Sequence, residues 1–363
     1  MGTRPRVALY SPYIPKHVGG GERYLLSVAE YFSHSHETFI LVREKIDEKT
    51  VRQKYEDAFH LDLSKVEFKQ TLIGTGASLF DRLRETAQYD ILYYLTDGSL
   101  FFSLARKNIL HIQFPFTFAK PEFSERLKLM NWSVKNTNSQ FTKQVVEKAW
   151  HTKIGFVHEP YIDNALFAPG KKENIIVSVG RFFTGLHCKR QDVLVESFRR
   201  LVRGGLSGWR LVLIGPIEPG VENAAYTASI ADAAKGLPIK IFHDASFDVL
   251  RQYYAAARIY WHAAGFEIDE QKEPLKVEHF GISTLEAMSS GAVPIVVGKG
   301  GQKEIVEDGK SGFFWQTTEE LATHTKRLMS DDDLQRQMSL AARERAMQFD
   351  KTRFIRTLEE MLK

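Results

Sequence analysis

The sequence predicts an α/β protein with two doubly wound domains that face one another across a cleft. Short apolar runs rich in β-forming residues alternate with helical patterns throughout the 363 residues, which is typical of parallel βαβ units. The alternation starts afresh after Pro160, and the chain is too long for one ordinary hydrophobic core. We therefore expect a first domain over 1–165, completed by a returning helix in 346–363, and a second domain over 166–345.

The first domain is expected to place helical patterns such as Glu22–Phe32 and Thr142–Trp150 between its strands. The expected strands are Arg6–Ser11, Thr38–Val42, Val66–Gln70, Ile91–Leu95, Asn108–Gln113, Val134–Thr137 and Gly155–His158. The stretch from Pro160 to Lys172 then separates the two domains, because proline and glycine within it interrupt regular structure.

The second domain repeats the same pattern, with a helix expected after each strand, the first of them Gln191–Val202. The expected strands are Ile175–Val179, Arg210–Ile214, Ile239–Phe242, Ile259–His262 and Val293–Val297. The last helical pattern, Asp350–Leu362, is expected to return to the first domain.

The composition is that of a soluble globular protein, with 43% hydrophobic and 26% charged residues and a net charge of +4. No run approaches the ~20 apolar residues that span a bilayer, and the run Val7–Tyr10 is too short for a signal peptide. The single cysteine, Cys188, excludes an internal disulfide and fits a reducing cytosol. We therefore expect a cytoplasmic protein. Its mild positive charge suits anionic small molecules or an anionic membrane surface, and it argues against nucleic acid as a partner.

Basic residues recur between Lys120 and Lys148, interleaved with apolar side chains such as Phe118, Phe123 and Trp132. We favour an ordinary amphipathic surface helix for this stretch. The alternative is peripheral contact with the inner face of an anionic membrane that carries a lipid acceptor.

Glu278 and Glu286 flank a segment that contains Gly281 and leads into a helical pattern. In doubly wound sheets, ligands bind beyond the carboxyl ends of the strands. A loop of small residues at such an end exposes backbone N–H groups, and the start of the next helix adds its positive dipole end. The segment therefore predicts a seat for an anion such as a diphosphate, with one glutamate for sugar hydroxyls and one for a ribose. A solvated helix face is the alternative interpretation of the two glutamates.

Other polar residues also follow predicted strands. Gly19–Gly21 opens a helix after the first strand and would allow close backbone approach to a phosphate, or would form a plain flexible turn. Arg181 and Lys189, with Arg190 beside it, follow the first strand of the second domain and suit a diphosphate leaving group. His111 ends a strand and could donate a hydrogen bond to a sugar hydroxyl or a departing phosphate.

Three further segments have weaker interpretations. Gly300–Glu304 could pair backbone amides with a ligand or simply turn, and the long loop 266–277 could be a lid or an acceptor contact. Asp331–Asp333 fits a metal-binding DxD pattern, but its place just before a helical pattern favours a helix cap. We therefore expect no metal site.

In this order, these residues resemble the retaining glycosyltransferases of family four, which have the GT-B fold of two Rossmann-like domains. The resemblance covers nearly the whole chain. The matching segments are the E-x7-E motif Glu278–Glu286, the trailing Pro294 with Gly300–Glu304, the phosphate-binding pair Gly180-Arg181 and Lys189, the first loop Gly19–Glu22, and the stretch Asn138–Thr142 that closes the first domain.

The resemblance implies a hexosyltransferase that moves a sugar from a UDP- or GDP-linked donor to a glycan, lipid-linked or small-molecule acceptor, with retained anomeric configuration. It implies no metal, no cofactor and no protein nucleophile, since the nucleotide sugar is a substrate and the chemistry is electrostatic stabilisation of the leaving diphosphate. The sequence of Glu278–Ser283 resembles that of mannosyltransferases that extend lipid-linked oligosaccharides and of their bacterial relatives. This resemblance implies a GDP-mannose-like donor.

The same resemblance implies a role for each motif residue. Arg181 and Lys189 would stabilise the diphosphate, Glu278 and His111 would contact the donor sugar, and Glu286 would contact the ribose. The remaining contacts to the nucleotide sugar would come from Gly19, Gly20, Phe280, Gly281, Ile282 and Ser283.

The sequence departs from the family pattern in two places. The spacing between Arg181 and Lys189 is longer than usual, which leaves Arg190 open as the second cation, and the insert 266–277 is longer than typical. The alternatives are a catalytically silent nucleotide-sugar-binding protein and another GT-B enzyme such as a sugar-nucleotide epimerase. The first would lack a phosphate cation or a glutamate, and this sequence lacks neither.

Overall fold

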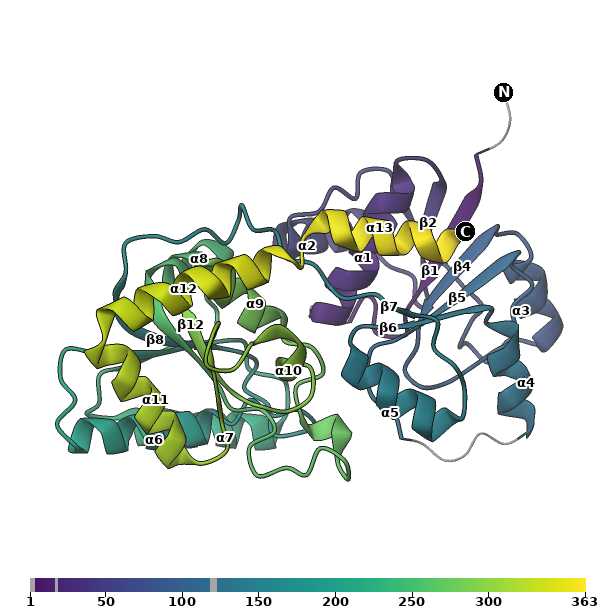
Figure 1. The fold of residues 1–363 in the computed structure, drawn as a ribbon. Helices are drawn as coiled ribbons and strands as arrows, with labels where there is room; N and C mark the ends of the chain where they lie inside the picture. Colours follow the sequence, from purple (N-terminus) through teal and green to yellow (C-terminus); the bar gives the residue numbers. More distant parts are fainter. Residues whose placement is uncertain (1–3, 17–18, 118–122) are drawn as a thin grey trace. The chain divides into compact units, whose positions relative to one another are not determined.

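The computed structural model describes residues 4–16, 19–117 and 123–363 (Figure 1). The chain divides into two compact units: unit 1 comprises Met1–Glu159 with Ile355–Lys363, and unit 2 comprises Pro160–Phe354. Unit 1 therefore ends before the expected boundary at 165 and resumes after the expected boundary at 346. Two contacts within unit 2 explain the shift, because the Ile162 amide donates to the Phe349 carbonyl (3.0 Å) and the Tyr161 and Phe354 rings pack 5.1 Å apart.

Unit 1 contains a seven-stranded, wholly parallel sheet with the order β3-β2-β1-β4-β5-β6-β7. Its strands are β1 Arg6–Tyr10, β2 Glu37–Val42, β3 Val66–Gln70, β4 Ile91–Leu95, β5 Lys107–Ile112, β6 Val134–Thr137 and β7 Phe156–Val157. Its helices are α1 Gly20–Ser33, α2 Glu48–Phe59, α3 Leu79–Thr86, α4 Phe123–Asn131, α5 Gln140–Trp150 and most of α13 Lys351–Leu362. The central strands are buried on both faces, which explains why they read as continuous apolar runs.

The helix expected at the end of the chain does return to unit 1. The Tyr31 hydroxyl on α1 donates to a Glu359 carboxylate oxygen at 3.2 Å, and the Lys107 ammonium donates to the Leu362 carbonyl. The terminal helix is thus tied both to a helix and to a strand of the first domain.

Unit 2 contains a six-stranded parallel sheet with the order β10-β9-β8-β11-β12-β13. Its strands are β8 Glu173–Val179, β9 Arg210–Ile214, β10 Ile239–Phe242, β11 Ala257–His262, β12 Val293–Val297 and β13 Phe313–Trp315. Its helices are α6 Gln191–Arg203, α7 Val221–Ala234, α8 Phe247–Ala256, the 3₁₀ turn η1 Pro274–Lys276, α9 Ile282–Ser289, α10 Gln302–Ile305, α11 Thr318–Ser330 and α12 Asp332–Met347. The three-residue edge strand β13 was not predicted, because so short a segment carries little periodicity.

Alternate residues of the unit 2 strands face two separate hydrophobic cores. Leu211 and Leu213 pack with α6 and α11 on one face, whereas Val212 and Ile214 pack with α9 on the other (Figure 1). Because successive side chains of each strand point to opposite faces of the sheet, helices pack on both faces. The carboxyl ends of the strands are left for the polar loops.

Asp331 is a helix cap, as expected. Its side chain accepts a hydrogen bond from the Leu334 amide at 2.9 Å and begins α12. The described residues contain no group of three or more His, Cys, Asp or Glu that could hold a metal ion. Among the same residues, no helix is long and apolar enough to cross a membrane.

Candidate active site

Unit 2 gathers predicted site residues at the carboxyl ends of two adjacent strands. β8 ends at Val179 and leads to Gly180 and Arg181, and its neighbour β11 ends at His262. Glu278 lies in the segment just before α9. Because neighbouring parallel strands end at the same edge of a sheet, residues far apart in sequence meet here.

Glu278 lies between two basic side chains. The Lys189 ammonium forms an ion pair with its Oε2 atom, and His262 Nε2 donates to the same oxygen at 2.9 Å. Gln302 donates to His262 Nδ1 (3.5 Å), which favours the tautomer with its proton on Nε2. The Lys189 and Glu278 side chains are only 17% and 14% exposed, so water screens this pair little.

The surroundings keep the carboxyl charged and the histidines neutral. Burial acts to raise the pKa of Glu278, but the attraction of Lys189 and the hydrogen bond from His262 outweigh it and hold this pKa well below 4.5. Burial lowers the pKa of His262, partly opposed by Glu278. Burial also lowers the pKa of His279 to about 4 and that of His187 to about 3. The positive charge of the site near pH 7 therefore comes from lysine and arginine.

Gly180 provides the space that Lys189 needs. A Cβ atom at position 180 would lie 2.6 Å from Lys189 Cγ, closer than real contacts allow. The lysine chain therefore crosses directly over the glycine backbone. This packing gives a structural reason for the Gly-Arg pair at the end of β8.

Arg181 and Arg190 have different partners. Arg181 is 39% exposed, forms an ion pair with Glu218 at 2.6 Å and lies over the Phe183 ring. Arg190 donates to both carboxylate oxygens of Asp192 at 3.0–3.1 Å. The cation that contacts Glu278 is thus Lys189, and the bond to Asp192 directs Arg190 elsewhere.

The start of α9 has the geometry expected of an anion seat. Gly281 has φ +117°, a conformation that favours glycine, and it turns the chain into the helix at Ile282. The Ser283 hydroxyl lies 2.9 Å from the Tyr260 hydroxyl. Glu286 is 8% exposed and accepts a hydrogen bond from Tyr254 at 3.2 Å, so the solvated-face alternative is wrong for this residue.

Two expectations for this region need correction. The Phe280 side chain is 3% exposed and packs in the core against Phe349, so its side chain is not placed to contact a donor. The amides of Gly300 and Gly301 donate to the Glu270 carboxylate (2.7 Å) and the Glu278 carbonyl (2.8 Å). These glycines pack against the Glu278 segment and are not available to a ligand.

The insert 266–277 is anchored to the same glycine segment. Besides its bond to Gly300, Glu270 forms an ion pair with Lys303 at 2.6 Å. Lys299 donates to the carbonyls of Gly265 (3.1 Å) and Ile268 (2.6 Å). The insert therefore braces the loop that supports Glu278.

In unit 1, the predicted residues lie at the start of α1 and in β5. Gly19 and Gly20 lie at the start of α1, as expected, while His17 and Val18 of the same loop fall outside the described residues. His111 is fully buried: it donates from Nδ1 to Asn136 at 2.5 Å, stacks on Tyr24 at 3.9 Å, and has its pKa lowered to about 3 by burial.

His111 is buried, yet its Nε2 atom has no hydrogen-bond partner among the described residues. Gln113, which follows the end of β5, is a second candidate for the sugar contact. A Cβ at Gly21 would lie 2.9 Å from Gln113 Oε1, and this buried oxygen accepts no hydrogen bond from the described residues. Sequence reasoning missed Gln113, and also His262 and Glu218, although each follows or ends a strand.

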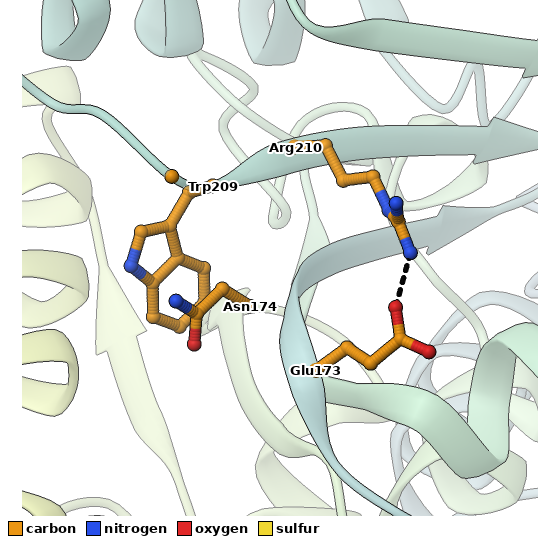
Figure 2. Close-up of a pocket in the computed structure, with 5 residues that line it drawn as sticks. Glu173, Asn174, Trp209 and Arg210 are labelled. Atoms are coloured by element: carbon orange, nitrogen blue, oxygen red, sulfur yellow. Dashed lines mark hydrogen bonds and ion pairs between the residues drawn. The ribbon is translucent and has the colours of Figure 1, made fainter.

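A separate pocket lies at the opposite edge of the unit 2 sheet, where β8 and β9 begin. Its volume is about 530 Å³, and its lining includes Trp209, Asn174 and the Arg210–Glu173 ion pair (Figure 2). It contains none of the predicted site residues, so it is distinct from the candidate active site.

Comparison with known proteins agrees with this geometry. Residues 163–345 match the family described as glycosyl transferases group 1. A segment of 146 residues is 27% identical to a glycogen synthase of Thermodesulfovibrio yellowstonii, and the match covers 40% of this chain and 25% of that protein's length.

Two solved structures have the same fold over nearly their full length. The Anabaena protein Alr3699/HepE, solved in complex with UDP and glucose, has a TM-score of 0.74 at 17% identity, with 99% of each chain covered. The sucrose-phosphate synthase of Thermosynechococcus elongatus has a TM-score of 0.71 at 16% identity, with 99% of this chain and 98% of that chain covered. The family model spans half of the sequence, and the chain therefore belongs to the glycosyl transferases group 1 family, with the GT-B fold.

Proposed function

We propose that this chain transfers a hexosyl group from a nucleotide-diphosphate sugar to an acceptor hydroxyl, with retention at the anomeric carbon and without a metal ion. The observation that carries the proposal is the Glu278 carboxylate, which lies between Lys189 and His262 just before α9. Arg181 lies at the end of the adjacent strand β8.

In the proposed reaction, the bond between the anomeric carbon and the diphosphate oxygen breaks, and the electron pair leaves with the nucleoside diphosphate. The acceptor hydroxyl oxygen forms the new bond to the anomeric carbon on the same face, and its proton passes to the departing diphosphate oxygen. Arg181 and Lys189 offset the charge that develops on this oxygen. The amide groups and dipole at the start of α9 contribute in the same sense. Each preorganised cation should lower the barrier by about 2–4 kcal/mol.

Glu278 is proposed to bind hydroxyls of the donor sugar, and Glu286 those of the ribose. With a pKa well below 4.5, Glu278 has no proton to donate at neutral pH. Its Oε2 atom is already occupied by Lys189 and His262, which makes it a weak base. A hydrogen-bond acceptor is therefore the role that its environment suits best.

The donor class to test first is UDP-linked hexose, because a solved structure with this fold binds UDP-glucose. The second donor class to test is a GDP-mannose-like sugar, which the resemblance of the Glu278–Ser283 sequence implies. The proposed acceptors are glycans and lipid-linked saccharides.

A thermal-shift screen over UDP-, GDP- and ADP-sugars would identify the donor, since binding at a hundred times Kd adds about 2.7 kcal/mol of apparent stability. Release of nucleoside diphosphate with candidate acceptors would measure turnover, and NMR of the product would show the anomeric configuration. We expect Arg181→Ala and Glu278→Ala to abolish turnover in a folded protein. Lys310→Ala is the control, because it removes an exposed cation of the same unit.

Each alternative has its own outcome in this experiment. Donor binding without turnover, with every acceptor class, would identify a silent binding protein. Conversion of the donor sugar into its epimer would identify an epimerase. Full activity of Arg181→Ala or Glu278→Ala would overturn the assigned site.

A further inference from the structure

The three cations predicted for the diphosphate seat each have a carboxylate partner within the described part of the chain. The ion pairs are Arg181–Glu218, Lys189–Glu278 and Arg190–Asp192. Arg190 also lies 4.0 Å from Glu267. The histidines beside these pairs are neutral near pH 7, because burial lowers their pKa values. The pairs have no excess of positive charge, whereas a nucleoside diphosphate is strongly anionic, so its binding is favoured if one carboxylate gives way.

Glu218 is the carboxylate that a diphosphate can displace most easily. Glu278 is held by both Lys189 and His262, and its side chain is only 14% exposed. The Arg181 and Glu218 side chains are 39% and 21% exposed, and an ion pair that water reaches in this way contributes little. A contact between arginine and phosphate is charge-assisted and can be bidentate. Arg181 therefore gains by exchanging Glu218 for a diphosphate.

The main chain around this pair is fixed, so the exchange requires only that side chains rotate. Gln191 Nε2 donates to the carbonyls of Gly180 and Arg181, both at 3.1 Å. The Glu218 amide donates to the Phe182 carbonyl at 3.2 Å. The loops after β8 and β9 are thus joined through their backbones, and displacing Glu218 leaves Arg181 at the end of β8.

We propose that Glu218 is an exchangeable counter-ion of Arg181, which neutralises the guanidinium until the diphosphate of donor or product displaces it. The inference rests on the proposed function, because it takes Arg181 as a diphosphate-binding residue. It adds that the Glu218 carboxylate weakens the binding of nucleoside diphosphate and so speeds the release of product. Glu218 acts through the charge of Arg181 and contacts neither the sugar nor the ribose.

Isothermal titration calorimetry of the full chain with UDP, and then with GDP, tests the proposal. Glu218→Gln keeps the shape of the side chain and its hydrogen-bond acceptor but removes the negative charge. We expect the Kd of the nucleoside diphosphate to fall about fivefold, the scale of an exposed ion pair. Stopped-flow measurement with a fluorescent UDP analogue should place most of the change in the dissociation rate.

Two matched variants show whether the effect passes through Arg181. Glu222 is an exposed acid in the first turn of α7, and it forms no ion pair within the described part of the chain. Glu222→Gln therefore makes the same change in net charge and should leave the Kd unchanged. In the background of Arg181→Ala, adding Glu218→Gln should bring no gain in affinity, because the cation that it would free is absent.

Steady-state kinetics give a readout that a merely structural role would not produce. Glu218→Gln should lower the KM for the donor and strengthen inhibition by the released nucleoside diphosphate, without raising kcat. If Glu218 instead served to hold Arg181 in place, its loss would raise KM. An unchanged Tm without ligand would show that the variant is folded.

The outcomes separate this inference from the proposed function. Unchanged or weaker UDP and GDP binding by Glu218→Gln, while the native chain binds, would overturn the counter-ion alone. An equal gain in Glu222→Gln would also overturn it, because the effect would then come from net charge. A native chain that binds no nucleoside diphosphate would overturn the donor site itself, and the counter-ion with it.

Discussion

Replacing Lys189 with methionine tests the ion pair at the centre of the candidate site. Methionine keeps much of the side-chain length but removes the cation that faces Glu278. Among the contacts of the described residues, the Glu278 carboxylate then keeps the hydrogen bond from His262. Removing one partner of a buried ion pair costs about 3–5 kcal/mol. Because the Glu278 side chain keeps 14% exposure and one hydrogen bond, we expect the free energy of unfolding of unit 2 to fall by about 2–4 kcal/mol.

The loss of stability should depend on pH in a defined direction. The pKa of Glu278 in the native protein is well below 4.5. A carboxyl whose folded pKa is depressed stabilises the protein above its unfolded pKa of about 4.3, and that contribution is lost as the pH falls through the folded pKa. Without Lys189, burial raises the pKa of Glu278 and the contribution disappears. The difference between native protein and variant should therefore be largest near pH 7 and shrink below about pH 4.

Urea unfolding followed by tryptophan fluorescence measures this difference, because Trp261 and Trp315 are fully buried in the core of unit 2. The double variant Lys189→Met/Glu278→Gln should recover most of the lost stability, since it removes the uncompensated charge, yet it should not recover transfer activity.

The control is Lys310→Met, whose ion pair with Glu307 is exposed (side chains 73% and 40%) and should contribute less than about 1 kcal/mol. The reasoning would be refuted if Lys189→Met were no more destabilising than this control, or if adding Glu278→Gln failed to restore stability.

Four other substitutions separate function from folding. Gly180→Ala places a Cβ 2.6 Å from Lys189 Cγ and should reduce kcat/KM on the order of tenfold or more, measured by diphosphate release. Asp331→Ala should lower the free energy of unfolding by about 1 kcal/mol through loss of the helix cap, with turnover unchanged. His111→Ala should lower the free energy of unfolding by about 2–4 kcal/mol because it opens a cavity, whereas Gln113→Ala should lower turnover with little change in Tm.

For three of these substitutions, a single result would contradict the expectation. Unchanged kcat/KM in Gly180→Ala would mean that the lysine position is not important. Divalent-metal-dependent turnover that Asp331→Ala removes would restore the metal interpretation. A Gln113→Ala protein with full activity would leave the first-domain contact unassigned.

The local sequence pattern was sufficient for the architecture and for placing most candidate-site residues near strand ends. Continuous apolar runs between helical patterns predicted nearly all strands, because burial on both faces of a parallel sheet demands such runs. Glycine at 281 and the capping aspartate at 331 are also local signals, since each is required by the backbone at its own position.

The errors lie where a side chain's direction depends on tertiary packing. β5 ends at Ile112, so His111 lies inside the sheet and is buried, while Gln113 lies beyond its edge. A pattern that locates strand ends to within a residue or two cannot distinguish these two positions. The burial of the Phe280 side chain was missed for a related reason, because its core partner Phe349 comes from a distant segment.

By itself, then, the sequence determined that two sheets form and which loops carry the polar residues, because both depend on local periodicity and on single backbone requirements. Tertiary structure decided which cation contacts Glu278. Lys189 and Arg190 are adjacent and both carry a positive charge, but Arg190 has a left-handed backbone with φ +51° and is held by Asp192. Lys189 instead crosses Gly180 to reach a carboxylate 89 residues away. Contacts at such separations arise only when the strands have been brought side by side, which no local pattern can specify.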